Sequence, residues 1–183
     1  EGGSFELYGS TAASVSITAP SAIPTLIINK DGRNEGSGAA GKSNPERTSY
    51  ISLLTNLELS SDLIISGGTF DLMGKTVAVG NDLEVYGKLK MVSASDLLQV
   101  QGSVYWYEGS SSEISNGVIE CYRDWNFWGG TANLSGSNTC VFKGDSNSLI
   151  YTLGNQFFAN VVFAKTSSTY QENLVTIDSD MQV

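Results

Sequence analysis

Histidine is absent from the 183 residues of this chain, and only 10 basic residues stand against 19 acidic ones. Without histidine, the chain lacks the usual general base near neutral pH, the catalytic dyads that depend on it and all histidine-containing zinc sites. The net charge of −9 opposes binding to nucleic acid and to anionic membranes, because both are recognised through Lys and Arg. We therefore expect no nucleic-acid partner.

Long apolar runs and cysteines are equally scarce. No stretch approaches the 18 uninterrupted apolar residues of a membrane-spanning helix, so we expect no membrane insertion. The two cysteines, Cys121 and Cys140, have a spacing that fits no CxxC metal-binding motif. They remain either a possible disulfide or a pair of buried thiols. The basic and then apolar profile of a signal peptide is missing after Glu1, and we expect a mature or excised piece of a longer chain.

What the chain does contain is short segments in which apolar and polar residues alternate. Examples are Leu57–Leu59, Phe70–Leu72, Leu83–Val85 and Val104–Trp106, each bounded by Gly, Asn, Asp or Ser. Period-two alternation is typical of strands with one buried face. No segment of twelve residues has a helical apolar stripe. The alternation without a helical stripe predicts an all-β fold. The apolar share of 40% is enough to form a sizeable core in it.

A glycine followed by two apolar residues at alternate positions recurs along the chain. We interpret each copy as a corner, at which glycine adopts a positive φ and the next strand begins. The intervals are irregular, so we expect some copies to begin different faces of the same coil. Coils of about 20 residues stacked as a solenoid would explain the pattern. The copies begin at Gly3, Gly68, Gly87, Gly102, Gly117 and Gly130.

A longer self-similarity supports the same interpretation. Residues 57–65 align with 175–183 at an offset of 118, residues 3–10 with 130–137 at 127, and residues 25–30 with 160–165 at 135. We therefore predict one β-solenoid piece over residues 1–183, containing slightly more than one module of about 120 residues. The growing offset predicts an insertion loop near residues 31–48, where apolar alternation is missing.

The coils over Val77–Met91 and the closing strand Phe158–Phe163 resemble the right-handed parallel β-helix repeats of large bacterial surface and secreted proteins of the adhesin or hemagglutinin type. The resemblance covers residues 50–183. It implies a structural or adhesive stalk, outside the cell or on its surface, and it transfers no catalytic residue. The alternative is an antiparallel β-sandwich that acts as a carbohydrate-binding module, since Asn116-Gly117 is a hairpin signal.

Candidate chemistry along the chain is sparse. Asp178 and Asp180 share one strand face, but Ser60 replaces the first of them in the aligned copy. Residues 36–43 satisfy the spacing of a phosphate-binding loop without the strand and helix that such a loop requires. We therefore expect no enzyme, with a polysaccharide-degrading β-helix enzyme as the alternative. Calcium is the only cofactor that the residues suggest, at two oxygen-rich stretches that match no EF-hand pattern: Asn29, Asp31, Asn34 and Glu35, and Asp145 with Asn147.

Aromatic residues form the feature that most favours binding. If Val104, Cys121, Trp125 and Phe127 point inward, four other aromatic side chains point outward and could form an apolar platform for a sugar ring or for a partner's surface. The opposing interpretation is that these rings only shield one another as ladder neighbours. The predicted glycan-binding residues are Tyr105, Tyr107, Tyr122 and Trp128.

Two further expectations concern geometry. If the strands after Gly68 and Gly87 stack in register, Asp71 faces Lys90 in the neighbouring coil. Since a solenoid presents unpaired strand edges at its ends, we also expect end-to-end self-association or continuation in a longer parent chain.

Overall fold

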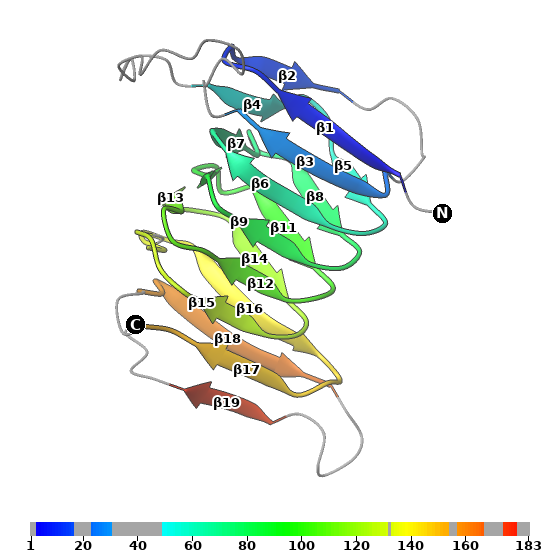
Figure 1. The fold of residues 1–183 in the computed structure, drawn as a ribbon. Coiled ribbons are helices and arrows are strands. Elements are labelled where there is room, and N and C mark those ends of the chain that lie inside the picture. The colour runs from blue at the N-terminus through cyan, green and yellow to red at the C-terminus, as the bar shows by residue number, and fades with distance from the viewer. Residues whose placement is uncertain are drawn as a thin grey trace.

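The chain folds as a parallel β-solenoid of about six turns (Figure 1). The structure is a computed structural model that describes residues 3–16, 23–30, 49–131, 133–153, 157–166 and 174–178. Within those ranges it contains 19 strands, all paired in parallel, and no helix. The described residues accordingly include no helix long and apolar enough to cross a membrane. The solenoid expected from the recurrent glycines, and the parallel β-helix implied by the resemblance, are confirmed.

Three sheets form the walls of the solenoid, and successive strands of one sheet come from successive coils. Sheet A comprises β1 (Ser4–Tyr8), β3 (Thr25–Asn29), β6 (Leu63–Gly67), β9 (Leu83–Val85), β12 (Val104–Trp106), β15 (Trp125–Phe127), β17 (Ser148–Tyr151) and β19 (Val175–Asp178). Sheet B comprises β2 (Ala13–Val15), β4 (Tyr50–Leu53), β7 (Thr69–Asp71), β10 (Lys88–Met91) and β13 (Ser111–Ile114). Sheet C comprises β5 (Leu57–Leu59), β8 (Thr76–Val79), β11 (Leu97–Val100), β14 (Val118–Cys121), β16 (Thr139–Gly144) and β18 (Asn160–Lys165).

Each complete coil visits the sheets in the order A, B, C. In sheet A, Leu63 pairs with Leu83, Leu83 with Val104 and Val104 with Trp125. These steps are 20, 21 and 21 residues, as the expected coil length requires. One side chain per strand position therefore stacks on its counterpart in the next coil.

The interior is filled by the alternate apolar residues of all three sheets. It consists mainly of Leu, Ile and Val in the N-terminal coils and becomes aromatic towards the C-terminal end. Trp125 lies at the centre of that region, with ring centroids 6.0 Å from Trp106 and 5.4 Å from Phe158. Val104, Cys121, Trp125 and Phe127 all point inward, as expected. Truncation of any of these large buried rings would leave a cavity in the core.

Side chains at the corner before sheet A tie consecutive coils together. The Asp62 Oδ1 atom accepts a hydrogen bond from the Asp82 amide at 3.1 Å, and Asp82 Oδ1 accepts one from the Ser103 amide at 2.7 Å. Two coils later, Asp124 Oδ1 accepts one from the Leu149 amide at 2.8 Å. These carboxylates satisfy amides at corners where the sheet hydrogen bonds are interrupted.

The interpretation of the recurrent glycines as positive-φ corners is correct for only some of them. Gly68, Gly117 and Gly130 have φ values of 73°, 78° and 93°. Gly87 and Gly102 do not have positive φ; a Cβ on Gly87 would lie 2.7 Å from the Gly68 carbonyl oxygen in the preceding coil. At those positions glycine is required because the backbones of two coils approach closely. The copies do begin different faces, since Gly68 precedes sheet B, Gly102 sheet A and Gly117 sheet C.

The aligned segments of the longer self-similarity do not occupy equivalent places. Leu57 lies in sheet C, whereas its counterpart Val175 lies in sheet A. Likewise, Leu26 lies in sheet A and Val161 in sheet C. The alignment therefore detects strands that resemble one another rather than a structural module of about 120 residues. The predicted insertion at 31–48, which includes the phosphate-loop-like residues 36–43, lies outside the described residues.

The alternative β-sandwich is excluded by the strand directions. Asn116 and Gly117 lie between β13 in sheet B and β14 in sheet C, and these strands belong to different sheets. The dipeptide forms a corner of the solenoid instead of a hairpin. Gly117 supplies the left-handed conformation there, which explains why the local sequence resembles a hairpin turn.

Candidate functional site

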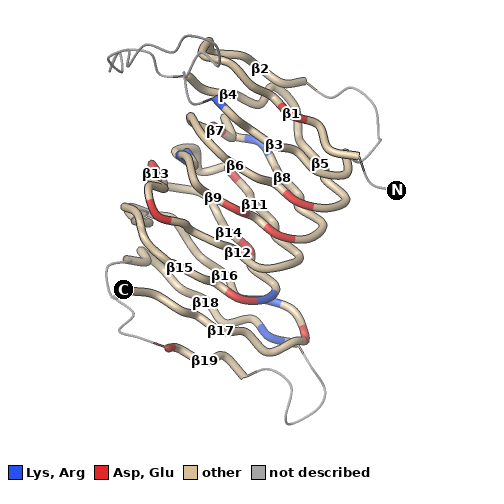
Figure 2. The backbone as a smooth tube through the Cα atoms, in the orientation of Figure 1, with Lys and Arg blue, Asp and Glu red and all other residues tan. Residues whose placement is uncertain are grey.

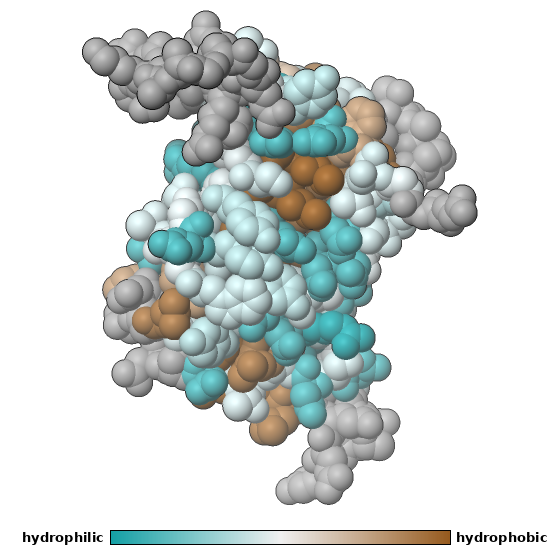
Figure 3. All heavy atoms as spheres, viewed as in Figure 1, coloured by the Kyte–Doolittle hydropathy of each residue, from teal (hydrophilic) through white to brown (hydrophobic). Residues whose placement is uncertain are grey.

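Four aromatic side chains gather on the outer face of sheet A; we call them the aromatic surface. Tyr105 points outward from the middle of β12, while Tyr86, Tyr107 and Trp128 each directly follow a strand, β9, β12 and β15. Because β9, β12 and β15 belong to three consecutive coils, three coils contribute to the aromatic surface. Figure 3, which has the orientation of Figure 1, shows the face of the molecule formed by sheet A.

Ring geometry shows which faces the cluster leaves open. Tyr86 and Tyr107 stack nearly parallel, with centroids 4.1 Å apart and an interplanar angle of 5°. Trp128 lies edge-on to Tyr107 at 5.1 Å and tilted to Tyr105 at 5.5 Å. The facing surfaces of the two tyrosines thus shield one another, as the opposing interpretation held. Trp128 remains 44% exposed and Tyr86 40%, so the two ends of the cluster offer accessible ring surface.

A carboxylate anchors one end of the aromatic surface. The Tyr86 hydroxyl donates a hydrogen bond to Glu84 Oε2 at 3.1 Å. Burial raises the pKa of Tyr86, and hydrogen bonding with Tyr107 and Glu84 raises it further. Burial also raises the pKa of Tyr105. Both phenols are therefore neutral near pH 7 and can act as hydrogen-bond donors.

Tyr122 lies apart from the other predicted residues. It follows β14 at the corner leading to sheet A, where Lys143 Nζ lies 5.7 Å from its ring centroid. Among the described residues, its ring shows no stacking with Tyr105, Tyr107 or Trp128. The structure thus brings together three of the four predicted residues.

Tyr86 is the member that the sequence interpretation missed. It precedes Tyr107 by 21 residues, and Tyr107 precedes Trp128 by 21 residues. That interval equals one coil, so a search for aromatic residues at the coil spacing would have found it. The amides of Tyr107 and Trp128 donate to Val85 and Trp106, respectively, which continues the ladder of sheet A.

The outer face of sheet A continues as an apolar strip towards the N-terminal coils. Ile27 pairs with Ile64, and Ile64 pairs with Glu84 beside the aromatic surface. Both isoleucines are half-buried, and a brown area lies over β3 and β6 in Figure 3. Acidic residues are spread along the length of the solenoid (Figure 2). A ligand on this face would meet apolar and aromatic groups with few cationic ones.

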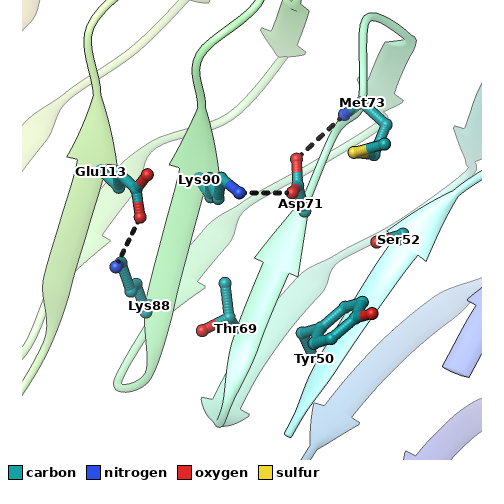
Figure 4. Close-up of a pocket in the computed structure, with 8 residues that line it drawn as sticks. All are labelled: Tyr50, Ser52, Thr69, Asp71, Met73, Lys88, Lys90 and Glu113. Carbon is teal, nitrogen blue, oxygen red and sulfur yellow. Dashed lines mark hydrogen bonds and ion pairs between the residues drawn. The ribbon is translucent and has the colours of Figure 1, made fainter. Parts of the chain in front are cut away.

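A recess lies on the outer face of sheet B (Figure 4). We call it the sheet B groove; its volume is about 400 Å³. Lys90 Nζ lies 3.0 Å from Asp71 Oδ2, and Lys88 Nζ lies 2.8 Å from Glu113 Oε2. The expected pairing of Asp71 with Lys90 in adjacent coils is confirmed. The groove is lined by Tyr50, Ser52, Thr69, Asp71, Met73, Lys88, Lys90 and Glu113.

In each ion pair of the groove, the pKa of one member is shifted. The hydrogen bond that Lys90 donates to Asp71 raises the pKa of Lys90. The hydrogen bond that Glu113 accepts from Lys88 lowers the pKa of Glu113. The groove thus combines two lysines and two acidic residues on a chain that is strongly acidic as a whole.

The cysteines are buried and unbonded. Cys121 pairs with Phe142 and Cys140 with Ile119 on adjacent strands of sheet C, which places the cysteines two register positions apart. Both are free thiols, so the possible disulfide is not formed in this structure. Burial raises the pKa of Cys121 to about 12 and that of Cys140 well above its usual value. The environment is typical of packing residues rather than of a nucleophile.

Of the remaining candidate ligands, only some lie within the described residues. Within the described ranges, no three acidic or cysteine side chains are placed to hold a metal ion. Asn147 Oδ1 accepts a hydrogen bond from the Leu174 amide at 2.9 Å, which is a structural role. Asp31, Asn34, Glu35 and Asp180 lie outside the described residues.

Comparisons with known proteins found no matching family model, no similar curated protein and no similar solved structure.

Proposed function

We propose that this chain is a structural and adhesive module of an extracellular or cell-surface protein, of the bacterial adhesin type, and that it binds glycan through the aromatic surface. The observation that carries the proposal is the clustering of four aromatic side chains from three coils, with Trp128 and Tyr86 still 44% and 40% exposed. Aromatic rings that stay accessible on a rigid sheet are suited to the apolar faces of sugar rings, while phenol hydroxyls supply hydrogen bonds.

The geometry favours an extended ligand over a deeply enclosed one. The aromatic surface runs across β9, β12 and β15, which follow the solenoid axis at strand spacings of about 4.8 Å. Trp128 and Tyr86 mark its two ends. A glycan chain lying along the axis would contact both open rings and cross the tyrosine edges between them.

Glycan-array binding with matched aromatic variants tests this proposal. Trp128→Ala should abolish binding to any glycan that the unmodified chain captures, because it removes the most exposed ring of the surface. Tyr8→Ala is the matched control: Tyr8 is 77% exposed on sheet A but belongs to β1, three strand positions from β9. Equal loss in both variants, or no captured glycan, would contradict the proposal.

The structural part of the proposal rests on the ends of the solenoid. β1 and β19 are the first and last strands in the described order of sheet A, and Phe163 and Ile177 in the last strands are 50% and 45% exposed. We infer end-to-end self-association, in which a second copy continues the parallel sheets. Light scattering should show a molar mass that rises with concentration, and Ile177→Lys should suppress the rise. A constant monomer mass would refute this part.

A further inference from the structure

The shape of the sheet B groove follows from two short side chains among long ones. Thr69 and Ser52 sit on the outer face of neighbouring strands β7 and β4. Around them stand Tyr50, Lys88 and Lys90, whose longer side chains rise above the sheet (Figure 4). The hollow is therefore floored by hydroxyl groups and walled by the Tyr50 ring and the Lys90 side chain, while the Lys88 ammonium is turned toward Glu113 (Figure 4).

Asp71 lies at the base of this hollow and binds two residues that line it. It is only 5% exposed, and its Oδ2 atom holds Lys90 while its Oδ1 atom accepts a hydrogen bond from the Met73 amide at 3.1 Å. Met73 has a φ of 53°, a conformation that side-chain-bearing residues rarely adopt, and its side chain is 55% exposed on the rim. One buried carboxylate thus fixes both a cationic wall and a strained turn, which is the kind of support expected around a preformed site.

The ammonium groups of Lys88 and Lys90 each have N–H bonds that their ion pairs do not use. Each carries three N–H bonds, and one carboxylate accepts from each at 2.8 Å or 3.0 Å. Lys88 and Lys90 alternate with Leu89, so both point to the same face of β10. Their side chains remain 35% and 29% exposed. Lys90 Nζ is turned toward Asp71 and Lys88 Nζ toward Glu113 (Figure 4). An anionic group beside either lysine could therefore accept one of the remaining N–H bonds without breaking that ion pair.

We propose that the sheet B groove binds a single sugar unit that carries an anionic group, a carboxylate or a sulfate. The ammonium groups would receive the anion, the hydroxyls of Ser52 and Thr69 would meet the sugar hydroxyls, and the Tyr50 ring, 40% exposed, would cover an apolar face of the ring. The volume of about 400 Å³ falls within the usual range of small-molecule sites. Repulsion by the net charge of −9 is screened beyond about 10 Å at 0.1 M salt.

This site is separate from the aromatic surface, because sheets A and B are different walls of the solenoid. Its proposal therefore does not depend on glycan binding at Trp128. The variant Trp128→Ala should leave the sheet B groove unaffected, so the failure of one proposal is distinguishable from the failure of the other.

Calorimetric titration of the full chain with four small probes tests the sheet B groove. Glucuronate and glucose 6-sulfate each combine sugar hydroxyls with an anion, glucose has only the hydroxyls, and acetate has only the anion. We expect saturable binding of at least one sugar anion, and binding of glucose and of acetate that is weaker by about tenfold or more, since each lacks one set of contacts.

Two variants locate the binding. Lys88→Gln should lower the affinity for the sugar anion by about tenfold, because it removes one cationic donor from a partly exposed ion pair. Lys143→Gln is the matched control, since Lys143 is 33% exposed and pairs with Glu120 at 2.9 Å on sheet C. The proposal is overturned if no sugar anion binds, if glucose or acetate binds equally well, or if the two variants lose affinity to the same degree.

Discussion

Lys90 and Asp71 face one another across two adjacent coils, with Nζ 3.0 Å from Oδ2. Asp71 is nearly buried, whereas Lys90 is partly exposed, so the two partners are not equivalent. A charged carboxylate that loses its cation at a buried position keeps its desolvation cost without compensation. The pair is therefore more sensitive to loss of the lysine than an exposed ion pair would be.

The first prediction follows from this asymmetry. Lys90→Met should lower the free energy of unfolding by roughly 1–3 kcal/mol, because the Asp71 carboxylate stays buried without its cation. Urea unfolding monitored by tryptophan fluorescence measures the change. The double variant Asp71→Asn, Lys90→Met should recover part of the loss. Lys88→Met should cost about 0–1 kcal/mol, since its partner Glu113 is 49% exposed; equal losses at both lysines would contradict the argument.

Close approach between coils yields the second prediction. Gly87→Ala should destabilise the fold by roughly 1–3 kcal/mol, since the new Cβ would lie 2.7 Å from the Gly68 carbonyl oxygen. The loss should be visible as a lower thermal midpoint. Gly3→Ala is the control, because no atom lies within 4 Å of its Cβ position. An unchanged midpoint for Gly87→Ala would show that the two coils can separate at little cost.

A third prediction concerns the carboxylates that connect coils at the corner before sheet A. Asp82→Ala leaves the buried Ser103 amide without its acceptor at 2.7 Å and should cost roughly 1–3 kcal/mol. Asp82→Asn keeps a side-chain oxygen in the same place and should cost less. Chemical denaturation of the two variants provides the comparison. The same loss for Asn and Ala would mean that the negative charge, rather than the hydrogen bond, stabilises the corner.

The fourth prediction uses the buried thiols. Because burial raises the pKa of Cys121 to about 12 and that of Cys140 well above the usual value, both thiols stay protonated and protected at pH 8. Iodoacetamide should therefore modify neither cysteine in the folded chain and both after denaturation without reductant, as read by intact mass. Two labels on the folded chain would contradict the burial. No label after denaturation would show that the purified protein contains a disulfide.

The raised pKa values of the two thiols also predict how the stability of the fold changes at alkaline pH. A thiol whose pKa is higher in the folded state favours folding by staying protonated, so its contribution is constant below the unfolded pKa near 9 and declines above it. The thermal midpoint should therefore fall as the pH rises from 9 towards 12. Cys121→Ala with Cys140→Ala should flatten this decline, and an identical decline in the double variant would assign it to other groups.

The residue pattern was enough to predict an all-β chain and its inward and outward positions, and it predicted that Asp71 would face Lys90 if the coils stacked in register. Alternation in Leu83–Val85 and Val104–Trp106 is visible locally, because successive side chains of a strand point to opposite faces. The parallel strand directions, and the wall that each strand joins, became known from the three-dimensional arrangement, which places Leu57 in sheet C and its aligned counterpart Val175 in sheet A.

The candidate sites likewise depend on which wall of the solenoid each strand joins. Tyr86 joins Tyr107 and Trp128 while Tyr122 does not, because corner lengths determine which residues of different coils stack. The sheet B groove likewise arises from short Thr69 and Ser52 beside long neighbours in other coils. A period of two distinguishes two faces of a strand, but a solenoid has three walls, and the corners that distribute strands among them depend on backbone contacts between coils.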